Sequence, residues 1–300
     1  MTRIGFLGVG RMGLPMCAKL AGAGYAVTAG DLRAELEAAV TECGARWKST
    51  SAEVAGAADV LITMLPGPQE VQDAMLEPGA ALDALTPGAT WIDMSSSSPA
   101  VGRTIAERAR ARGVGVLDAP VGGGVAAAVA GKLALFVGGD AMLVERHRAL
   151  LGVVGDPERI LHVGGHGAGY TTKLLVNLLW FGQAVATAEA LLLGRRAGID
   201  LDVLREALAS SAASSEFIRH DLEALFNGDY LESFGLDRCV EELATVTALA
   251  RESGVPFELS KLVERIHRRA LARYGAVDGE LLAVALLEEE AGVPLRRAPA

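Results

Sequence analysis

A lysine and an asparagine stand one helical turn apart in the second half of the chain. Lys173 and Asn177 have the i, i+4 spacing that brings two side chains to one face of a helix. Most helical lysines are solvated, but the residues around Lys173 are apolar, so we expect this helix to be largely buried. Burial disfavours the ammonium form and suits a lysine for exchanging a proton with an alcohol oxygen. The pair is a candidate for acid–base chemistry, in which Asn177 holds the reacting oxygen or the lysine.

A glycine motif near the N-terminus has the spacing of a dinucleotide-binding loop. Gly8, Gly10 and Gly13 follow an apolar run at 3–7 and precede a helical pattern. In that setting the first glycine permits a tight turn, the second lets the backbone approach a pyrophosphate, and the third allows close packing of helix and strand. Glycines also mark plain turns, but the flanking strand and helix favour the cofactor loop.

An aspartate follows the second predicted strand, where a carboxylate can bind the adenosine ribose of a dinucleotide. Asp31 occupies this position, and its charge would repel the 2′-phosphate of NADP. Arg33 stands two residues later and could bind that phosphate instead. The residues therefore favour NAD and leave NADP open. A helix N-cap at Asp31, before a helix at 33–40, is the alternative.

Two sequence patterns divide the chain. Up to about residue 163, Ala-rich helical stretches alternate with short β-branched runs, for example at 3–7, 26–29, 60–64, 90–93 and 115–118. This rhythm predicts βαβ units and a parallel sheet, with polar loops at the carboxyl ends of the strands, the edge where such sheets bind ligands. After the glycine-rich stretch 164–169 the strand pattern stops, and helices are expected at 170–198, 201–210, 215–226, 235–253, 259–274 and 279–290.

The predicted fold class is therefore α/β, a Rossmann-type doubly wound sheet followed by an all-α C-terminal domain. We expect a dinucleotide-binding domain at 1–163, an all-α substrate domain at 164–290 and a frayed tail at 291–300. The length of 300 residues agrees with two domains.

Composition narrows the classes of partner. A formal charge of −9 lacks the basic excess that nucleic-acid binding needs. Cys17, Cys43 and Cys239 show no metal-binding or disulfide spacing, and we expect reduced packing residues, no metal site and a cytoplasmic protein. The apolar start is too short for a signal peptide, and no run of 18 uninterrupted apolar residues offers a membrane span. A small molecule is the expected partner.

Further motifs occur in a fixed order through both halves of the chain. They are Gly-Phe-Leu-Gly-Val-Gly-Arg-Met-Gly at 5–13, Met-Leu-Pro at 64–66, Asp-Met-Ser-Ser at 93–96, Asp-Ala-Pro-Val at 118–121, Gly-Lys-Leu at 131–133, and Gly-Ala-Gly at 167–169 before Lys173 and Asn177. In this order and spacing the chain resembles the β-hydroxyacid dehydrogenase family over about residues 3–290. That family includes 3-hydroxyisobutyrate dehydrogenases and is related to 6-phosphogluconate dehydrogenase and imine reductases.

The resemblance implies an NAD(P)-dependent oxidoreductase whose Rossmann domain is joined by a long interdomain helix to an α domain that also serves dimerisation. It implies an active site in the cleft, a homodimer or homotetramer, and hydride transfer to or from a small hydroxy acid or polar alcohol or aldehyde, with Lys173 as general acid/base. Together with the motifs above, it indicates cofactor binding by Gly8, Gly10, Arg11, Met12, Gly13, Asp31, Leu65, Pro66 and Ser96. It indicates substrate binding by Ser96, Gly122, Gly123, Gly124, Lys173, Asn177 and Glu241.

Three positions depart from the family pattern. Gly122, Gly123 and Gly124 stand where relatives carry a serine that binds a substrate carboxylate, so either their backbone N–H groups form an anion-binding concavity or the segment is a ligand-free turn. Glu241 replaces a lysine of the cleft and would repel a carboxylate 4 Å away by about 4 kcal/mol at an effective dielectric constant of about 20. Val176 replaces the first of two asparagines.

The substitution at Glu241 leaves several readings open. Arg238, one turn earlier, is a candidate replacement cation; Glu241 could select a substrate with an amine or many hydroxyls; or it lies on a solvated helix face. An imine reductase or reductive aminase would suit an acidic residue here, but such relatives generally lack the helix lysine. A non-enzymatic protein that binds the cofactor and signals redox state is a third reading, since fold alone does not define function.

Overall fold

The computed structural model describes residues 2–297. They form two compact units, of which unit 1 ends at Lys173 and unit 2 begins at Leu174, inside the long helix α9 (Ala168–Arg196). The expected domain boundary at 163–164 falls before this helix, at the end of the last strand, and stays a prediction.

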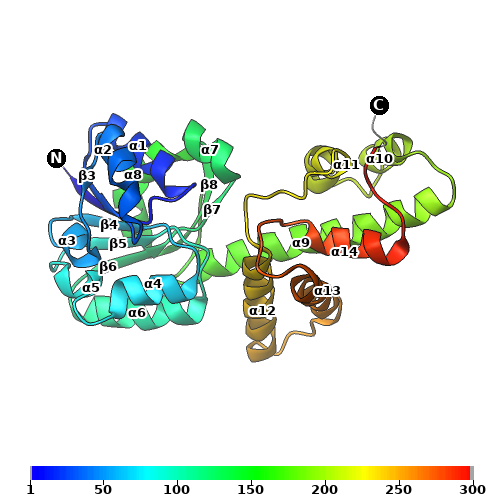
Figure 1. Cartoon of the computed structure of the whole chain (residues 1–300). Helices are drawn as coiled ribbons and strands as arrows, with labels where there is room; N and C mark the ends of the chain where they lie inside the picture. Colours follow the sequence, from blue (N-terminus) through cyan, green and yellow to red (C-terminus); the bar gives the residue numbers. More distant parts are fainter. Residues whose placement is uncertain (1, 298–300) are drawn as a thin grey trace. The chain divides into compact units, whose positions relative to one another are not determined.

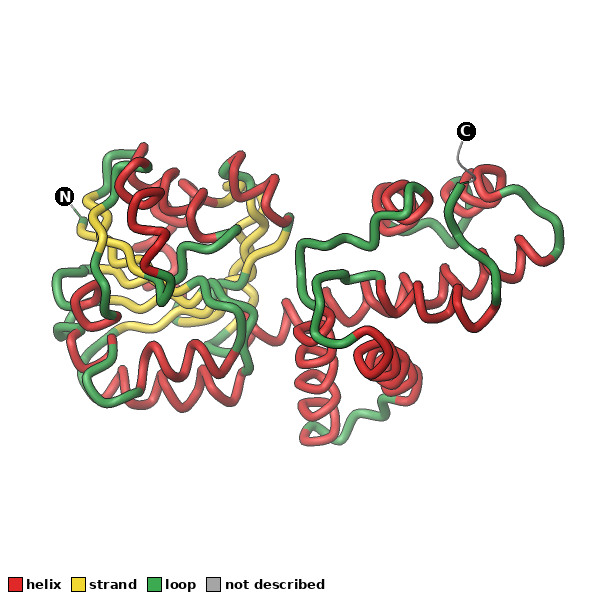
Figure 2. Tube along the Cα trace, in the orientation of Figure 1, coloured by secondary structure: helices red, strands yellow, loops and turns green. Residues whose placement is uncertain are grey.

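Unit 1 is built on a nine-stranded sheet with helices on both faces (Figures 1 and 2). The strands are β1 Arg3–Leu7, β2 Ala26–Gly30, β3 Arg46–Trp47, β4 Val60–Thr63, β5 Thr90–Asp93, β6 Gly115–Asp118, β7 Val121–Gly122, β8 Leu133–Gly139 and β9 Gly155–Gly164. Their order is β3-β2-β1-β4-β5-β6-β8-β7, with β9 paired to β8. The first six are parallel, and the order reverses between β1 and β4, as in dinucleotide-binding sheets. The predicted Rossmann-type fold is confirmed.

The pairing of the last three strands, β7, β8 and β9, does not follow from the sequence pattern. β8 runs antiparallel to β6 and β7, and β9 is parallel to β8. These strands contain several glycines and no clean alternation of apolar and polar residues, so their pattern is weak.

Two hydrophobic layers cover the sheet because side chains alternate along each strand. Ile4 and Phe6 of β1 pack in one core and Leu7 in the other; in β5, Ile92 and Trp91 divide in the same way. The helices of unit 1 are α1 Gly13–Gly22, the 3-10 turn η1 Ala34–Leu36, α2 Glu37–Glu42, α3 Ser51–Ala55, α4 Pro68–Leu76, α5 Ala81–Ala84, α6 Pro99–Ala111, α7 Gly124–Ala130 and α8 Ala141–Val154.

The described residues of unit 2 form helices and loops, with one isolated bridge between Gly235 and Asp278. After α9 come α10 Leu201–Ala209, the π-helical turn η2 Phe217–Asp221, α11 Leu222–Phe226, α12 Leu236–Glu252, α13 Glu258–Tyr274 and α14 Leu282–Ala291. Two apolar clusters lie along α9 in this unit. The predicted all-α half and the long helix are confirmed.

Helix α9 is apolar over most of its 29 residues. An 18-residue window has a mean hydropathy of 1.4, so by length and composition alone it is apolar enough to cross a membrane, but 44% of that window is buried in the fold. A core helix of a globular protein passes the same test.

The last described residues correct the expectation of a frayed tail. Leu295 is fully buried, and its N–H donates to Glu288. Arg297 forms ion pairs with Asp202 and Glu223. Residues 298–300 lie outside the described part of the chain.

The three cysteines are free thiols. Cys17 and Cys43, distant in sequence, lie with their sulfur atoms 4.0 Å apart in unit 1. Burial is the main cause that raises the pKa of the Cys17 thiol, and the nearby Cys43 thiol raises it further.

Candidate active site

The cofactor residues predicted from sequence gather at one edge of the sheet in unit 1. The glycine motif follows β1, Asp31 follows β2, Leu65 and Pro66 follow β4, and Ser96 follows β5. These four strands are parallel neighbours, so their carboxyl ends meet at this edge. The loops flank the point where the strand order reverses.

The glycine loop has the close contacts that its residue types predict. Gly8 has φ +91°, and an added Cβ would clash with the carbonyl oxygen of Met64. Among the described residues, the one heavy atom within 4 Å of a Cβ added at Gly10 is Nη2 of the exposed Arg33 side chain, at 3.3 Å, so apart from that guanidinium the backbone is open to a ligand. Arg11 is exposed and Met12 is half-buried in the same loop. The loop fits a pyrophosphate at the start of α1.

Asp31 carries a full set of hydrogen bonds. Its Oδ2 accepts from Val9 N at 3.0 Å and Arg33 Nη2 at 3.0 Å, while Oδ1 accepts from Arg33 N at 3.1 Å and Nε at 2.9 Å. Burial opposes ionisation, but these bonds prevail and lower the pKa of Asp31. The N-cap alternative is wrong, because Arg33 itself is the N-cap residue of η1.

A carboxylate offers about four acceptor sites, and all four on Asp31 are taken. Ribose hydroxyls can therefore bind Asp31 only when the Arg33 side chain, 54% exposed, moves away.

Two aspartates at the ends of neighbouring strands hold the loops of this edge. Asp93 and Asp118 are register partners in β5 and β6, and both are fully buried. Asp93 Oδ1 accepts from Ser95 N at 3.0 Å, and Ser95 Oγ accepts from Leu65 N at 2.9 Å. The backbone that presents Leu65 and the loop before Ser96 are thus tied to one carboxylate.

The same aspartates hold the beginning of α9. Asp118 accepts from Gly167 N at 2.8 Å and Tyr170 N at 3.0 Å, and Asp93 Oδ2 accepts from Tyr170 Oη at 2.7 Å. Burial raises the pKa of Asp93 to about 6, and hydrogen bonds from Ser95, Tyr170 and Thr63 oppose that shift. No local spacing rule assigns these residues a role, although an aspartate at the end of each of two successive strands is a signal in the sequence.

The three consecutive glycines at 122–124 span the end of strand β7 and the start of helix α7. Gly122 belongs to β7 and pairs with Ala134 of β8, whereas Gly123 and Gly124 are exposed and have φ +111° and +65°. The short helix α7 begins at Gly124. Only Gly123 lies between these two elements, and substrate binding by the segment stays a prediction.

Lys173 ends unit 1, in the second turn of α9. The expectation that it lies in a largely buried stretch is wrong: Lys173 is half-buried, and the following Leu175 and Val176 are 44% and 43% exposed. The apolar sequence misled because only one side of α9 packs into a core.

In unit 2, α9 and α12 place an amide against acidic residues. Asn177 Nδ2 donates to Glu242 Oε2 at 2.6 Å, and Glu242 is 8% exposed. This bond uses one of the two Nδ2 hydrogens of Asn177 and leaves the carbonyl oxygen as its acceptor. Sequence reasoning singled out Glu241, and the residue that contacts Asn177 is its neighbour.

Glu241 forms an ion pair instead. Its Oε2 lies 3.0 Å from Arg238 Nη1, and 37% of its side chain is exposed. Arg238 also lies 3.8 Å from Asp237. The first turns of α12 thus combine three carboxylates with one guanidinium, a net negative group.

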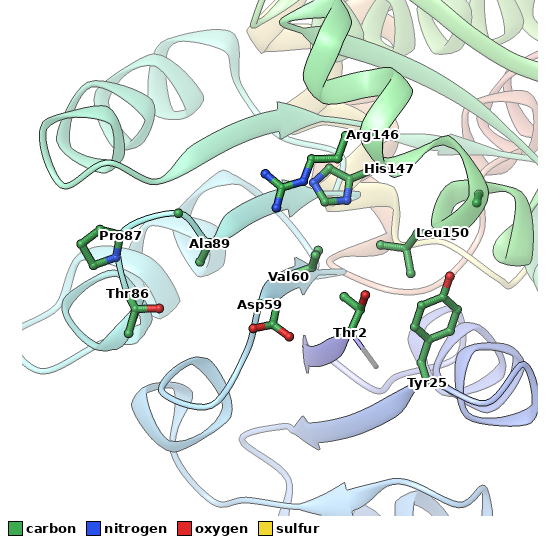
Figure 3. Close-up of a pocket in the computed structure, with 12 residues that line it drawn as sticks. Thr2, Tyr25, Asp59, Val60, Thr86, Pro87, Ala89, Arg146, His147 and Leu150 are labelled. Carbon is green, nitrogen blue, oxygen red and sulfur yellow. The ribbon is translucent and has the colours of Figure 1, made fainter.

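One cavity of about 520 Å³ lies at the other end of the strands (Figure 3). Its lining includes Asp59 and Ala89, which directly precede β4 and β5, and His147 of α8. His147 Nε2 lies 3.0 Å from Thr90 Oγ1, and burial lowers the His147 pKa to about 4. This cavity holds none of the predicted site residues. Residues 2–297 contain no cluster of potential metal ligands.

The order of the strands and the glycine loop after β1 together define a Rossmann-type dinucleotide-binding domain. Residues 3–165 match the family described as the NAD binding domain of 6-phosphogluconate dehydrogenase. Residues 167–287 match the one described as NAD-binding of NADP-dependent 3-hydroxyisobutyrate dehydrogenase.

Individual relatives agree with these matches. The chain is 34% identical over 265 residues to 2-(hydroxymethyl)glutarate dehydrogenase of Eubacterium barkeri, covering 88% of this chain and 87% of that protein. It is 39% identical over 215 residues to 3-hydroxyisobutyrate dehydrogenase of Pseudomonas aeruginosa, covering 72% of each. The solved structure of Mycobacterium tuberculosis 3-hydroxyisobutyrate dehydrogenase with L-serine has a TM-score of 0.85 at 28% identity, over 95% of this chain and 99% of that one.

The chain belongs to the β-hydroxyacid dehydrogenase family, of the 3-hydroxyisobutyrate dehydrogenase type. It is an NAD(P)-dependent hydroxyacid dehydrogenase.

Proposed function

We propose that Lys173 exchanges the proton while hydride passes between the nicotinamide and a small hydroxy acid or polar alcohol or aldehyde. The supporting observation is that Lys173 and Asn177 are one turn apart on the continuous helix α9. In the reductive direction the ammonium group of Lys173 donates a proton to the new alkoxide oxygen; in the oxidative direction its amine takes the hydroxyl proton. The bound nicotinamide supplies or accepts the hydride.

Lys173 is half-buried, so its proposed role does not depend on deep burial of the amine. A half-buried Lys173 can recover its proton from water after each turnover, so deep burial is not needed for its role. Asn177, fixed through Nδ2 by Glu242, would accept a hydrogen bond from the substrate hydroxyl or from the lysine through its carbonyl oxygen.

NAD is the proposed cofactor. Asp31 directly follows β2, a position from which a carboxylate can bind ribose hydroxyls in Rossmann folds, and a carboxylate disfavours a 2′-phosphate. Binding of NAD would displace the Arg33 side chain from Asp31. If NADP were the cofactor instead, the Arg33 guanidinium would bind its 2′-phosphate.

A reductase acting on a cationic imine or amine is the second candidate. The net negative group of Asp237, Arg238, Glu241 and Glu242 favours it, because acidic residues attract an iminium ion. Lys173 weighs against it, since the imine reductases of this family generally lack that residue.

We also propose a homodimer or homotetramer in the cytoplasm. Exposed apolar side chains on α9, among them Leu175 and Leu179, support assembly with a second copy, and three free cysteines suit a reducing compartment. Light scattering after size-exclusion chromatography measures the mass of the assembly; a monomer at working concentration would refute the assembly.

The decisive experiment combines a substrate panel with Lys173→Ala. Purified enzyme is assayed by NADH and NADPH absorbance on hydroxy acids, amino alcohols, polyols and cyclic imines. We expect hydroxy acids or polyols to react, and Lys173→Ala to lose about a hundredfold or more in kcat while it still binds NADH. Undiminished turnover by Lys173→Ala would refute the acid–base role, and reaction with imines alone would favour the second candidate.

A further inference from the structure

Tyr170 lies three residues before Lys173, in the first turn of α9. The tyrosine is 1% exposed, so its hydroxyl must find a partner inside the protein. That partner is Asp93 Oδ2, at 2.7 Å, while the backbone N–H of Tyr170 donates to Asp118. One residue of α9 is therefore bound to the ends of two adjacent strands.

Asp93 links the tyrosine to the cofactor edge. Its other oxygen accepts from Thr63 Oγ1 at 2.8 Å and from Ser95 N at 3.0 Å, and Ser95 Oγ in turn accepts from Leu65 N at 2.9 Å. The chain of hydrogen bonds runs from the loop of Leu65 to the phenol of Tyr170 within unit 1.

The space for the tyrosine ring is provided by a glycine on α6. An added Cβ at Gly102 would clash with Cε2 of Tyr170. The ring is thus held by a neighbouring helix backbone as well as by its hydroxyl, and a buried, fully bonded group of this kind has few alternative positions.

We propose that Tyr170 is a positioning residue, which fixes the turn of α9 that carries Lys173 relative to the loops at Leu65 and Ser96. Residues three apart on a helix share a face, so a shift of Tyr170 moves the base of the Lys173 side chain with it. The role rests on the proposed function of Lys173 and acts through that residue.

The test is Tyr170→Phe, which removes the hydroxyl and keeps the ring. We expect kcat to fall about tenfold to a hundredfold, as for a misplacement of roughly 1 Å, with the pH profile of kcat displaced and NADH binding unchanged. In a Lys173→Ala background, Tyr170→Phe should cause no further loss, because the residue it positions is gone.

Tyr230→Phe is the matched control. Tyr230 Oη donates to Glu288 in unit 2 at 2.7 Å, so the variant removes a similar phenol–carboxylate bond away from α9's first turn. Its kcat and pH profile should match wild type. An equal loss of kcat in this control would overturn the inference, because general destabilisation would then explain both variants.

Gly102→Ala supplies a second route if Tyr170→Phe does not fold. It pushes on the ring and leaves every hydrogen-bonding group in place, and it should lower kcat with the same displaced pH profile. If either variant folds and keeps the kcat and the pH profile of the wild type, the positioning role is overturned. If Lys173→Ala keeps full turnover, the proposed function fails and the positioning role fails with it; if only Tyr170→Phe keeps it, the positioning role alone fails.

Discussion

Asp93 and Asp118 in unit 1 and Glu241 in unit 2 are held in different ways. In unit 1, Asp93 and Asp118 are fully buried and bind backbone N–H groups and hydroxyls of fixed loops. In unit 2, the Glu241 side chain is 37% exposed and pairs with Arg238, whose side chain is 29% exposed. A buried bonded carboxylate fixes geometry, whereas an exposed ion pair contributes about 1 kcal/mol or less to stability and mainly sets local charge. A change at Asp93 or Asp118 should therefore disturb the geometry of unit 1, whereas a change at Glu241 should mainly alter local charge.

The largest expected effect is the pH dependence that Asp93 gives to the free energy of unfolding. The folded pKa of Asp93, about 6, lies above the usual value near 4, so the native state binds more protons than the unfolded state between these values. This contribution to the free energy of unfolding is fully present below about pH 4 and is lost as the pH rises through 6, a change of about 3 kcal/mol. Asp93→Asn should lack it.

Denaturant unfolding of wild type and Asp93→Asn from pH 4 to 7.5 measures this difference directly. Subtracting the two curves removes groups with the opposite dependence, such as Asp59, whose pKa hydrogen bonds from Arg3 lower to about 2. A difference curve without slope in this range would show that the aspartate keeps its ordinary pKa.

A charge reversal on α12 tests the other side of the comparison. Glu241→Lys should lower KM for a hydroxy carboxylate about tenfold to a hundredfold with little change in kcat, because it removes one negative charge beside Arg238 and adds a cation. Glu241→Gln, the matched neutral variant, should fall between the two. If neither variant changes the KM for hydroxy carboxylates or for amino alcohols, Glu241 lies on a solvated face of the helix.

A smaller effect is expected at the ribose position. Asp31→Ala should weaken NADH about tenfold relative to NADPH, because it removes charged hydrogen bonds to the ribose. Arg33→Ala should do the reverse and strengthen NADH, because it frees acceptor sites on Asp31. Fluorescence titrations of both cofactors measure these preferences, and equal shifts for NADH and NADPH would exclude a role in selection.

The sequence could predict elements whose signal is local. The bounds of β1, β5 and β6 agree with the expected strands, because each is a short, mainly apolar run followed within two residues by a glycine, serine or proline. The glycine loop was recognised for the same reason. In α12 and α13 an apolar stripe with a clear helical period set the bounds to within a residue or two.

Contacts between distant residues explain what was missed. Tyr170 and Asp93 are separated by 77 positions, and Asn177 and Glu242 by 65, so no spacing rule connects them. The exposure of Lys173 was misjudged because apolar residues surround α9 on more sides than the protein covers. Roles in catalysis and binding for the predicted residues stay predictions.

The packed C-terminal segment has a practical consequence for recombinant work. Leu295 completes an apolar cluster of unit 2, and Arg297 lies over the ring of Phe226 while it bridges Asp202 and Glu223. A truncation after α14 would open this cluster to water, remove the Arg297 ion pair of Asp202 and leave Glu223 paired with Arg205 alone. Shortened chains would lose stability in the unit that carries Asn177 and Glu241, and a weak result in a substrate screen would then reflect the truncation rather than the enzyme.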